Sequence, residues 1–136
     1  MIKLSRENVL LLHQLTIMTS GGEEGVRDYG LLDSAVNGTY LTFDGKELYP
    51  TKEEKAARLG FSLIMNHAFF DGNKRIGLLS MLSFLAVNGI YMKYTDQELV
   101  KIGFSIAEGA MQYEDLLSWV KHHKIHSKNN EAERNQ

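Results

Sequence analysis

Residues 67–75, with the sequence His-Ala-Phe-Phe-Asp-Gly-Asn-Lys-Arg, lead directly into a segment that is apolar on nearly every side. That segment continues to residue 87 and ends at Asn88-Gly89, a pair typical of a helix C-terminus. A helix that is apolar all round is buried in the core of its domain. We therefore expect a buried central helix from about residue 73, with residues 67–72 as the loop at its entrance.

Helix signals continue on both sides of this segment. Ser5 and Asp28 are typical N-cap residues, and Thr51 and Thr95 each begin a capping-box spacing, in which a hydroxyl and a carboxylate satisfy free amides at a helix start. The apolar spacing behind these caps predicts further helices over about residues 5–19, 28–36, 51–66, 95–109 and 113–123. The chain is thus predicted to be all-α in class, with mostly helical structure.

Residues 38–50 are the exception to this helical pattern. Residues 39–43 favour a strand, Asp44-Gly45 is a hairpin turn signal, and residues 46–49 can return as the second strand. We expect a small β-hairpin here.

The composition limits the classes of protein that fit. With 136 residues and 43% hydrophobic content, the chain matches one domain, predicted over residues 1–124, followed by a disordered tail over residues 125–136 that has nothing to bury. The chain has no cysteine, and its start lacks the pattern of a secretion signal, which points to the cytoplasm. A formal charge of -2 disfavours direct DNA binding, and no apolar run is long enough for a membrane span.

His67 is the candidate general base. An imidazole with a pKa near neutrality can take a proton from an attacking hydroxyl at cellular pH. The alternative is that His67 merely ends a helix, where its cation is favourable beside the negative end of the dipole. The charged and amide residues that follow within the same short stretch favour the catalytic interpretation.

The next residues are candidates for phosphate binding. Gly72 and Asn73 precede the central helix, so their backbone amides belong to the unpaired donors of its first turn. Lys74 and Arg75 add positive charge, and the planar guanidinium can bind phosphate oxygens in pairs. They could also be a solvated first turn, but cations oppose the helix dipole at this end, which suggests an anionic ligand.

Asp71 has two interpretations that chemistry alone leaves open. It could hold Mg²⁺ through one oxygen, with the remaining coordination sites taken by water and nucleotide phosphates. It could equally be the N-cap of the central helix. Phe69 is expected to plug the core and shape the loop, His13 carries no evident role, and His122, His123 and His126 are expected to form a solvated helix end.

The stretch at residues 67–75 resembles the signature of the Fic/Doc superfamily, His-x-Phe-x-Asp-(Ala/Gly)-Asn-Lys-Arg, and looks closest to the Doc (death-on-curing) branch. The resemblance covers most of the chain to about residue 123 and implies a compact Fic-type helical bundle. It also implies that Asp71 carries Mg²⁺ and that residues 38–50 form a flap that clamps the substrate.

Lys74 distinguishes the branches of this superfamily. AMP-transferring Fic proteins usually have glycine at the corresponding position, whereas in Doc-like proteins the lysine accompanies transfer of the terminal phosphate to a hydroxyl of elongation factor Tu. The resemblance further implies a toxin that is neutralised by a small Phd-like antitoxin.

Together these observations predict a cytoplasmic toxin that transfers phosphate from ATP or another nucleoside triphosphate to a Ser or Thr hydroxyl of a protein. His67 would be the base, Asp71 the Mg²⁺ ligand, and Gly72, Asn73, Lys74 and Arg75 the phosphate-binding residues. Two alternatives stay open: a Fic-type AMP transferase, and a non-catalytic module that binds a nucleotide or a partner.

Overall fold

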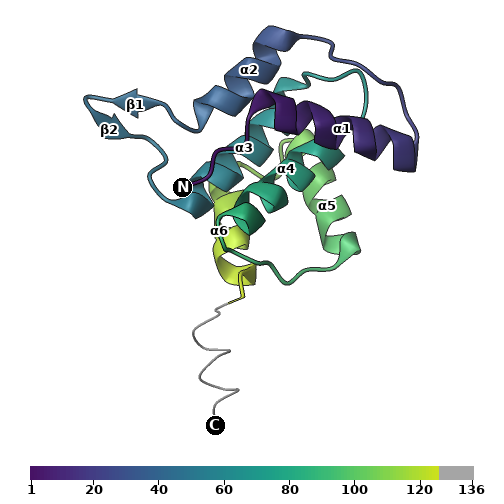
Figure 1. Ribbon diagram of the computed structural model, residues 1–136. Helices are drawn as coiled ribbons and strands as arrows, with labels where there is room; N and C mark the ends of the chain where they lie inside the picture. The colour runs from purple at the N-terminus through teal and green to yellow at the C-terminus, as the bar shows by residue number, and fades with distance from the viewer. Residues whose placement is uncertain (126–136) are drawn as a thin grey trace.

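The computed structural model describes residues 1–125 of the chain. Its elements in chain order are α1 (Arg6–Ser20), α2 (Tyr29–Gly38), β1 (Thr42–Phe43), β2 (Lys46–Glu47), α3 (Lys52–Asn66), α4 (Asn73–Val87), α5 (Asp96–Ala107) and α6 (Tyr113–His123). The helices gather into one bundle, and the two strands form a small hairpin that projects from its side (Figure 1). The predicted helical class with a small hairpin is confirmed.

Local sequence signals set the helix starts. Ser5 and Asp28 are the N-caps of α1 and α2, and their side chains accept hydrogen bonds from the amides of Asn8 and Leu31. Thr51 and Thr95 form complete capping boxes at the starts of α3 and α5, as predicted. These caps satisfy amides that a helix would otherwise leave free in its first turn.

Helix α4 is the centre of the bundle. It packs against α3 most extensively and also against α1 and α5, and its residues Ile76, Met81 and Leu85 are fully buried. Close packing with α3 is possible because Gly60 and Gly77 face each other where the two helices meet. The predicted central helix is therefore present, with its bounds as expected.

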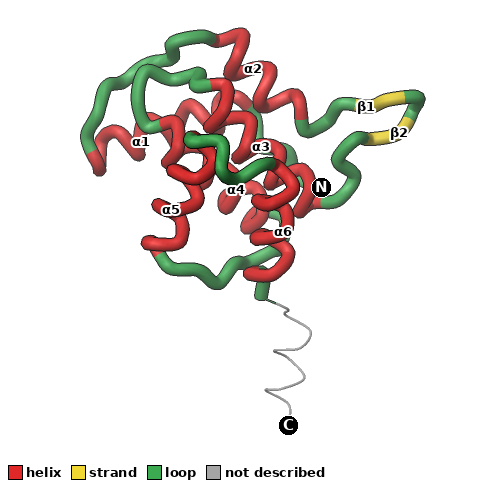
Figure 2. The backbone as a smooth tube through the Cα atoms, turned by 180° about the vertical axis from the view of Figure 1, so that it is seen from behind, coloured by secondary structure: helices red, strands yellow, loops and turns green. Residues whose placement is uncertain are grey.

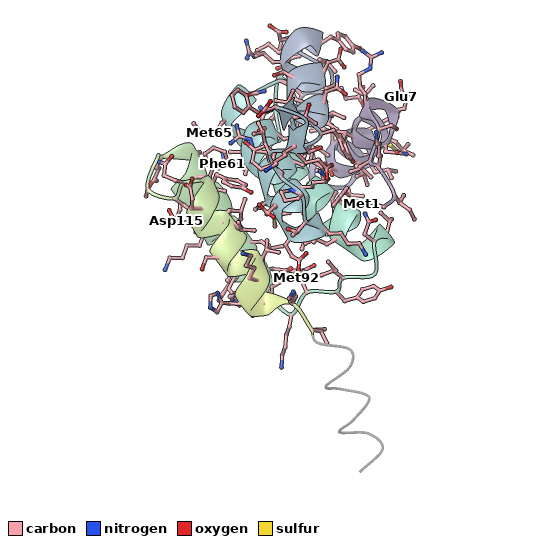
Figure 3. All side chains as sticks on the ribbon, turned by 90° about the vertical axis from the view of Figure 1, so that its left-hand side faces the viewer. Met1, Glu7, Phe61, Met65, Met92 and Asp115 are labelled. Atoms are coloured by element: carbon pink, nitrogen blue, oxygen red, sulfur yellow. The ribbon has the colours of Figure 1, made fainter. Side chains whose placement is uncertain are left out.

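Helix α6 covers another side of α3. In the side view, Phe61 and Met65 of α3 lie beside α6, the helix that carries Asp115 (Figure 3). Leu116 and Val120 of α6 are buried in the same core as α3 and α4. None of the helices in residues 1–125 combines the length and apolar character needed to cross a membrane.

Several predicted boundaries differ from the structure. The strands predicted over residues 39–43 and 46–49 are shorter, Thr42–Phe43 and Lys46–Glu47, and α2 continues past residue 36 to Gly38. Helix α5 ends at Ala107 rather than Gly109, because Gly109 adopts a left-handed backbone with φ 84° that cannot continue a helix. The tail was predicted to begin at residue 125, yet the amide of Ile125 donates a hydrogen bond to the Tyr91 carbonyl at 2.7 Å. The remaining residues of the predicted tail lie outside the described residues.

Candidate functional site

His67 ends α3 in a strained backbone conformation. It is the C-cap residue, with φ 53° and ψ 50°, a left-handed region that non-glycine residues enter at a cost. Arg27 stabilises this end of the helix, since its Nε donates to the His67 carbonyl at 2.8 Å and its Nη2 donates to the Asn66 carbonyl at 3.3 Å. His67 is exposed rather than turned into the core, so it is accessible from solvent.

The loop after His67 is braced by the segment that precedes α2. The amides of Arg27 and Asp28 both donate to the Ala68 carbonyl, at 2.7 and 3.1 Å, and Val26 pairs with Phe69 in an isolated antiparallel bridge. This pairing was not predicted from the sequence, because a single bridge between distant residues leaves no periodic pattern.

Asn73 locks the same loop from the other side. Its side-chain oxygen accepts from the Phe69 amide at 3.0 Å, and its side-chain nitrogen donates to the Phe69 carbonyl at 2.9 Å. Phe69 itself is fully buried, as expected of a residue that shapes the loop. The Asn73 side chain therefore holds the loop, and only the backbone amide of Asn73 lies at the helix start for a ligand.

His13 was assigned no role from the sequence, yet it supports the loop directly. The ring is 4% exposed and stacks on Phe69, with centroids 3.8 Å apart and an interplanar angle of 16°. Its Nε2 donates to the Asp71 carbonyl at 2.8 Å, which requires a proton on that nitrogen. A lone histidine on the first helix gives no signal in the sequence that indicates such a partner.

Asp71 is held by backbone amides and does not cap α4. Its Oδ2 accepts from the Glu23 amide at 3.1 Å and its Oδ1 from the Gly72 amide at 2.8 Å. These two bonds, the Glu23 bond first, hold the pKa of Asp71 below its ordinary value of 3.8, so the carboxylate is ionised at neutral pH. The N-cap interpretation of Asp71 is wrong, because the N-cap of α4 is Gly72.

The N-terminus of α4 lacks a side-chain cap within the described part of the chain. Gly72 has φ 75°, a conformation that glycine adopts readily, and it turns the chain sharply into the helix. The first-turn amides, which start at Asn73, are thus not bonded by a capping side chain. Such a helix end, with the positive end of the dipole, binds phosphate and other anions.

These residues open onto a groove between α1, α4 and α5 with a volume of about 540 Å³. Asp71, Gly72, Asn73, Lys74 and Arg75 all line it, so the structure brings five of the six predicted site residues together. The Lys74 ammonium lies over the Phe104 ring, 5.0 Å from its centroid. His67 is not among the residues that line this groove, and it lies at the other end of the loop, after α3.

The histidines near the C-terminus were predicted to form a solvated helix end. His122 is exposed, but His123 is partly buried, stacks on Trp119 and approaches Glu98 Oε2 at 3.1 Å. His126 lies outside the described residues. No cluster of three or more His, Asp or Glu side chains suited to a metal occurs in residues 1–125, so a cation at Asp71 would need further ligands from water and phosphate.

The geometry defines a helical protein with an uncapped, cation-flanked entrance to its central helix and an exposed histidine at the end of the helix before it. The sequence profile of the Fic/DOC family matches residues 3–85, which is more than half of the chain. The chain therefore belongs to the Fic/Doc family.

A curated relative carries the same likeness. Toxin Doc of Mycolicibacterium smegmatis (strain ATCC 700084 / mc(2)155) is 45% identical over 89 residues. The match covers 65% of this chain and 66% of the relative, just under two thirds of the relative's length.

Proposed function

We propose that the protein is a Doc-like toxin that transfers phosphate from a nucleoside triphosphate to a Ser or Thr hydroxyl of a protein. The observation that carries this proposal is the uncapped N-terminus of α4, flanked by Lys74 and Arg75 and adjoined by the ionised carboxylate of Asp71. Phosphate is the anion that such a donor set suits best, because amides, a point charge and a planar guanidinium follow one another at one helix start and line one groove.

His67 is the proposed base in this reaction. It accepts the proton of the attacking hydroxyl while a new bond forms between that oxygen and the terminal phosphorus. The bond from this phosphorus to the bridging oxygen breaks, and a nucleoside diphosphate leaves. The exposure of His67 supports this role, since a hydroxyl on another protein can reach it only at the surface.

Asp71 fits the role of Mg²⁺ ligand that the family resemblance implies. Its carboxylate is exposed, its two oxygens are oriented by backbone amides, and its pKa is lowered. A bound Mg²⁺ would supply charge neutralisation between phosphate oxygens. The Lys74 and Arg75 side chains add to this neutralisation, which supplies most of the catalysis in phosphoryl transfer.

Lys74 favours transfer of phosphate over transfer of AMP. AMP-transferring relatives usually have glycine at this position, whereas here a long cation extends along the groove toward Phe104. The groove has room for this side chain because residue 103 is a glycine. A Cβ at Gly103 would lie only 3.2 Å from Lys74 Cβ and would crowd the lysine. A cation in this position neutralises a phosphate that glycine would leave to solvent.

The relative's name, Toxin Doc, supports the biological part of the proposal. We propose a cytoplasmic toxin whose partner is a Phd-like antitoxin and whose target is elongation factor Tu, so that its activity inhibits translation. Expression of the chain in a bacterial host should arrest growth, and coexpression of the small reading frame adjacent to its gene should relieve the arrest.

Labelling with ATP tests the chemistry. A bacterial extract is incubated with the protein and with ATP labelled at either the γ- or the α-phosphate, for the wild type and for His67→Ala. We expect γ-label alone on a protein band at the size of elongation factor Tu, and a loss on the order of 10²-fold or more in His67→Ala. His122→Ala, which removes an exposed histidine on α6, is the matched control and should label normally.

Three results would contradict the proposal. Incorporation of α-label would identify an AMP transferase. Binding of ATP and Mg²⁺ without labelling of any protein would indicate a non-catalytic module. Unchanged labelling by His67→Ala would exclude His67 as the base.

A further inference from the structure

The hairpin formed by β1 and β2 stands apart from the helical bundle. Views from the front and from behind both show it projecting to one side (Figures 1 and 2). Its four strand residues are exposed, with Phe43 at 75% exposure, and the strands pair with each other alone among the described elements. A two-stranded hairpin without a packed face is marginally stable by itself. Something outside the two strands must therefore hold it in place.

Lys55 of α3 supplies the connection. This side chain is 2% exposed, and its Nζ donates three hydrogen bonds, to the Thr39 carbonyl at 3.2 Å, to Glu47 Oε1 at 2.9 Å and to the Tyr49 carbonyl at 2.5 Å. The three acceptors lie before β1, within β2 and after β2. An ammonium group has three donors, so one cation ties both ends and the second strand of the hairpin to one helix.

The buried charge makes this arrangement specific. An ammonium group taken out of water is costly unless it is paired and hydrogen-bonded. The Glu47 carboxylate provides the opposite charge, and the Tyr40 ring lies 5.2 Å from the ammonium. Any large movement of residues 39–49 would break the three hydrogen bonds of Lys55 and its ion pair with Glu47. The segment is also held at its far end, where Tyr49 packs edge-on against Tyr113.

We propose that Lys55 is a positioning residue that fixes the flap, residues 38–50, for binding of the protein substrate. This inference rests on the proposed function. Helix α3 carries Lys55 near its start and is followed directly by its C-cap residue His67, so one rigid element links the flap to the base. The nucleotide groove lies on α1, α4 and α5 and has no residue in the flap. Loss of Lys55 should therefore affect the protein substrate and spare the nucleotide.

Lys55→Met tests the inference, because methionine keeps an unbranched apolar stem and removes the charge. Hydrogen exchange measures the freedom of residues 39–49. Kinetics with purified elongation factor Tu give kcat and KM, and calorimetry gives the nucleotide Kd. We expect faster exchange in the flap and a rise in KM on the order of tenfold, with kcat and Kd near wild type, since charged hydrogen bonds are the strong ones. Lys101→Met, an exposed lysine on α5, is the control and should match the wild type.

A milder variant covers the case in which Lys55→Met fails to fold. Glu47→Gln keeps an acceptor of the same length, removes only the charge, and changes a side chain that is about half exposed. Like Lys55→Met, it should make hydrogen exchange in the flap faster and raise KM, but by a smaller factor. An unchanged rate of hydrogen exchange in the flap of either folded variant would overturn the proposal. So would a rise in the nucleotide Kd by the same factor as the rise in KM. If the wild type does not modify elongation factor Tu, the proposed function fails, and the exchange measurement still decides whether Lys55 anchors the flap.

Discussion

The His13 ring joins the hydrophobic core to the loop that carries Asp71. One face stacks on Phe69, and the edge donates a hydrogen bond to the Asp71 carbonyl. The Asp71 carboxylate accepts one hydrogen bond from the Glu23 amide, on the α1 side of the loop, and one from its neighbour Gly72. The first helix and the segment after it thus contribute two of the contacts that orient the proposed Mg²⁺ ligand, through His13 and the Glu23 amide.

Replacement of His13 separates these two contributions. His13→Phe keeps a flat ring for stacking and removes the donor, whereas His13→Gln keeps a donor at similar reach and loses the ring. Groups that orient a metal ligand typically contribute 10- to 100-fold to metal affinity. We expect His13→Phe to weaken binding of Mg²⁺ with a nonhydrolysable ATP analogue by roughly tenfold, and His13→Gln to restore part of it, as measured by calorimetry.

The two variants also distinguish orientation from simple stability. If both lose the same thermal stability and the same affinity, His13 is a packing residue only. The orienting role is supported if His13→Gln, which keeps the donor, binds Mg²⁺ and the ATP analogue more tightly than His13→Phe, whichever of the two variants has the higher melting temperature.

The site residues differ in how far the sequence could predict them. Asp71, Gly72, Lys74 and Arg75 could be proposed from the sequence because they lie within one short stretch at a helix start, where the free amides favour phosphate. His13 was missed because its partner is 58 positions away, and nothing in a single sequence records that separation. The side-chain role of Asn73 was missed for the converse reason: a residue at a helix start can face a ligand or its own loop, and only packing decides.

At the scale of elements, the turn after α1 is fitted to the Asp71 carboxylate. A Cβ added at Gly22 would lie 2.7 Å from Asp71 Oδ2, closer than Cβ atoms approach such neighbours in real proteins. A Cβ at Gly21 would meet nothing within 4 Å. Both glycines have positive φ, 80° and 115°, so a side chain at either strains the backbone.

This pair provides a matched test of the Asp71 position. Gly22→Ala adds a collision with the carboxylate to the backbone strain, and Gly21→Ala adds the strain alone. We expect Gly22→Ala to weaken Mg²⁺-dependent nucleotide binding on the order of tenfold relative to Gly21→Ala, at similar losses of thermal stability. Equal nucleotide affinity in the two variants would show that the position of the Asp71 carboxylate does not depend on the missing side chain at Gly22.

The elements themselves were predictable where their signals are local. Capping boxes at Thr51 and Thr95 marked helix starts correctly, and Asp44-Gly45 forms the hairpin turn with positive φ at both residues, 53° and 76°. The bridge between Val26 and Phe69 was not predictable, since it consists of one pair across more than 40 residues. The burial of Lys55 was also not predictable from the sequence, because a lysine on a helix is usually solvated.

At the scale of the whole molecule, the packing of α3 on α4 sets the relation between the two parts of the site. Helix α3 ends just before His67 and α4 begins after Gly72, so a shift of one helix against the other moves the proposed base relative to the proposed phosphate donors. The contact is close because glycines meet there: a Cβ at Gly77 would lie 2.8 Å from the Gly60 carbonyl oxygen and 2.6 Å from Ile64 Cγ1.

Gly77→Ala should therefore affect both stability and activity. The added methyl group meets a backbone atom that cannot rotate away, so the helices must separate, and overpacking of this kind costs about 1–3 kcal/mol. Urea unfolding should show a lower midpoint with an unchanged slope. Gly38→Ala, at the end of α2 with open space around it, is the control and should leave the protein as stable or raise stability by up to about 1 kcal/mol.

The same substitution should lower activity. Because separated helices displace His67 from the phosphate donors, turnover by the folded fraction of Gly77→Ala should fall. Nucleotide affinity should change less, since it depends on α4 and its neighbours α1 and α5. A variant that is destabilised but keeps full turnover when folded would show that the α3–α4 distance does not govern the reaction.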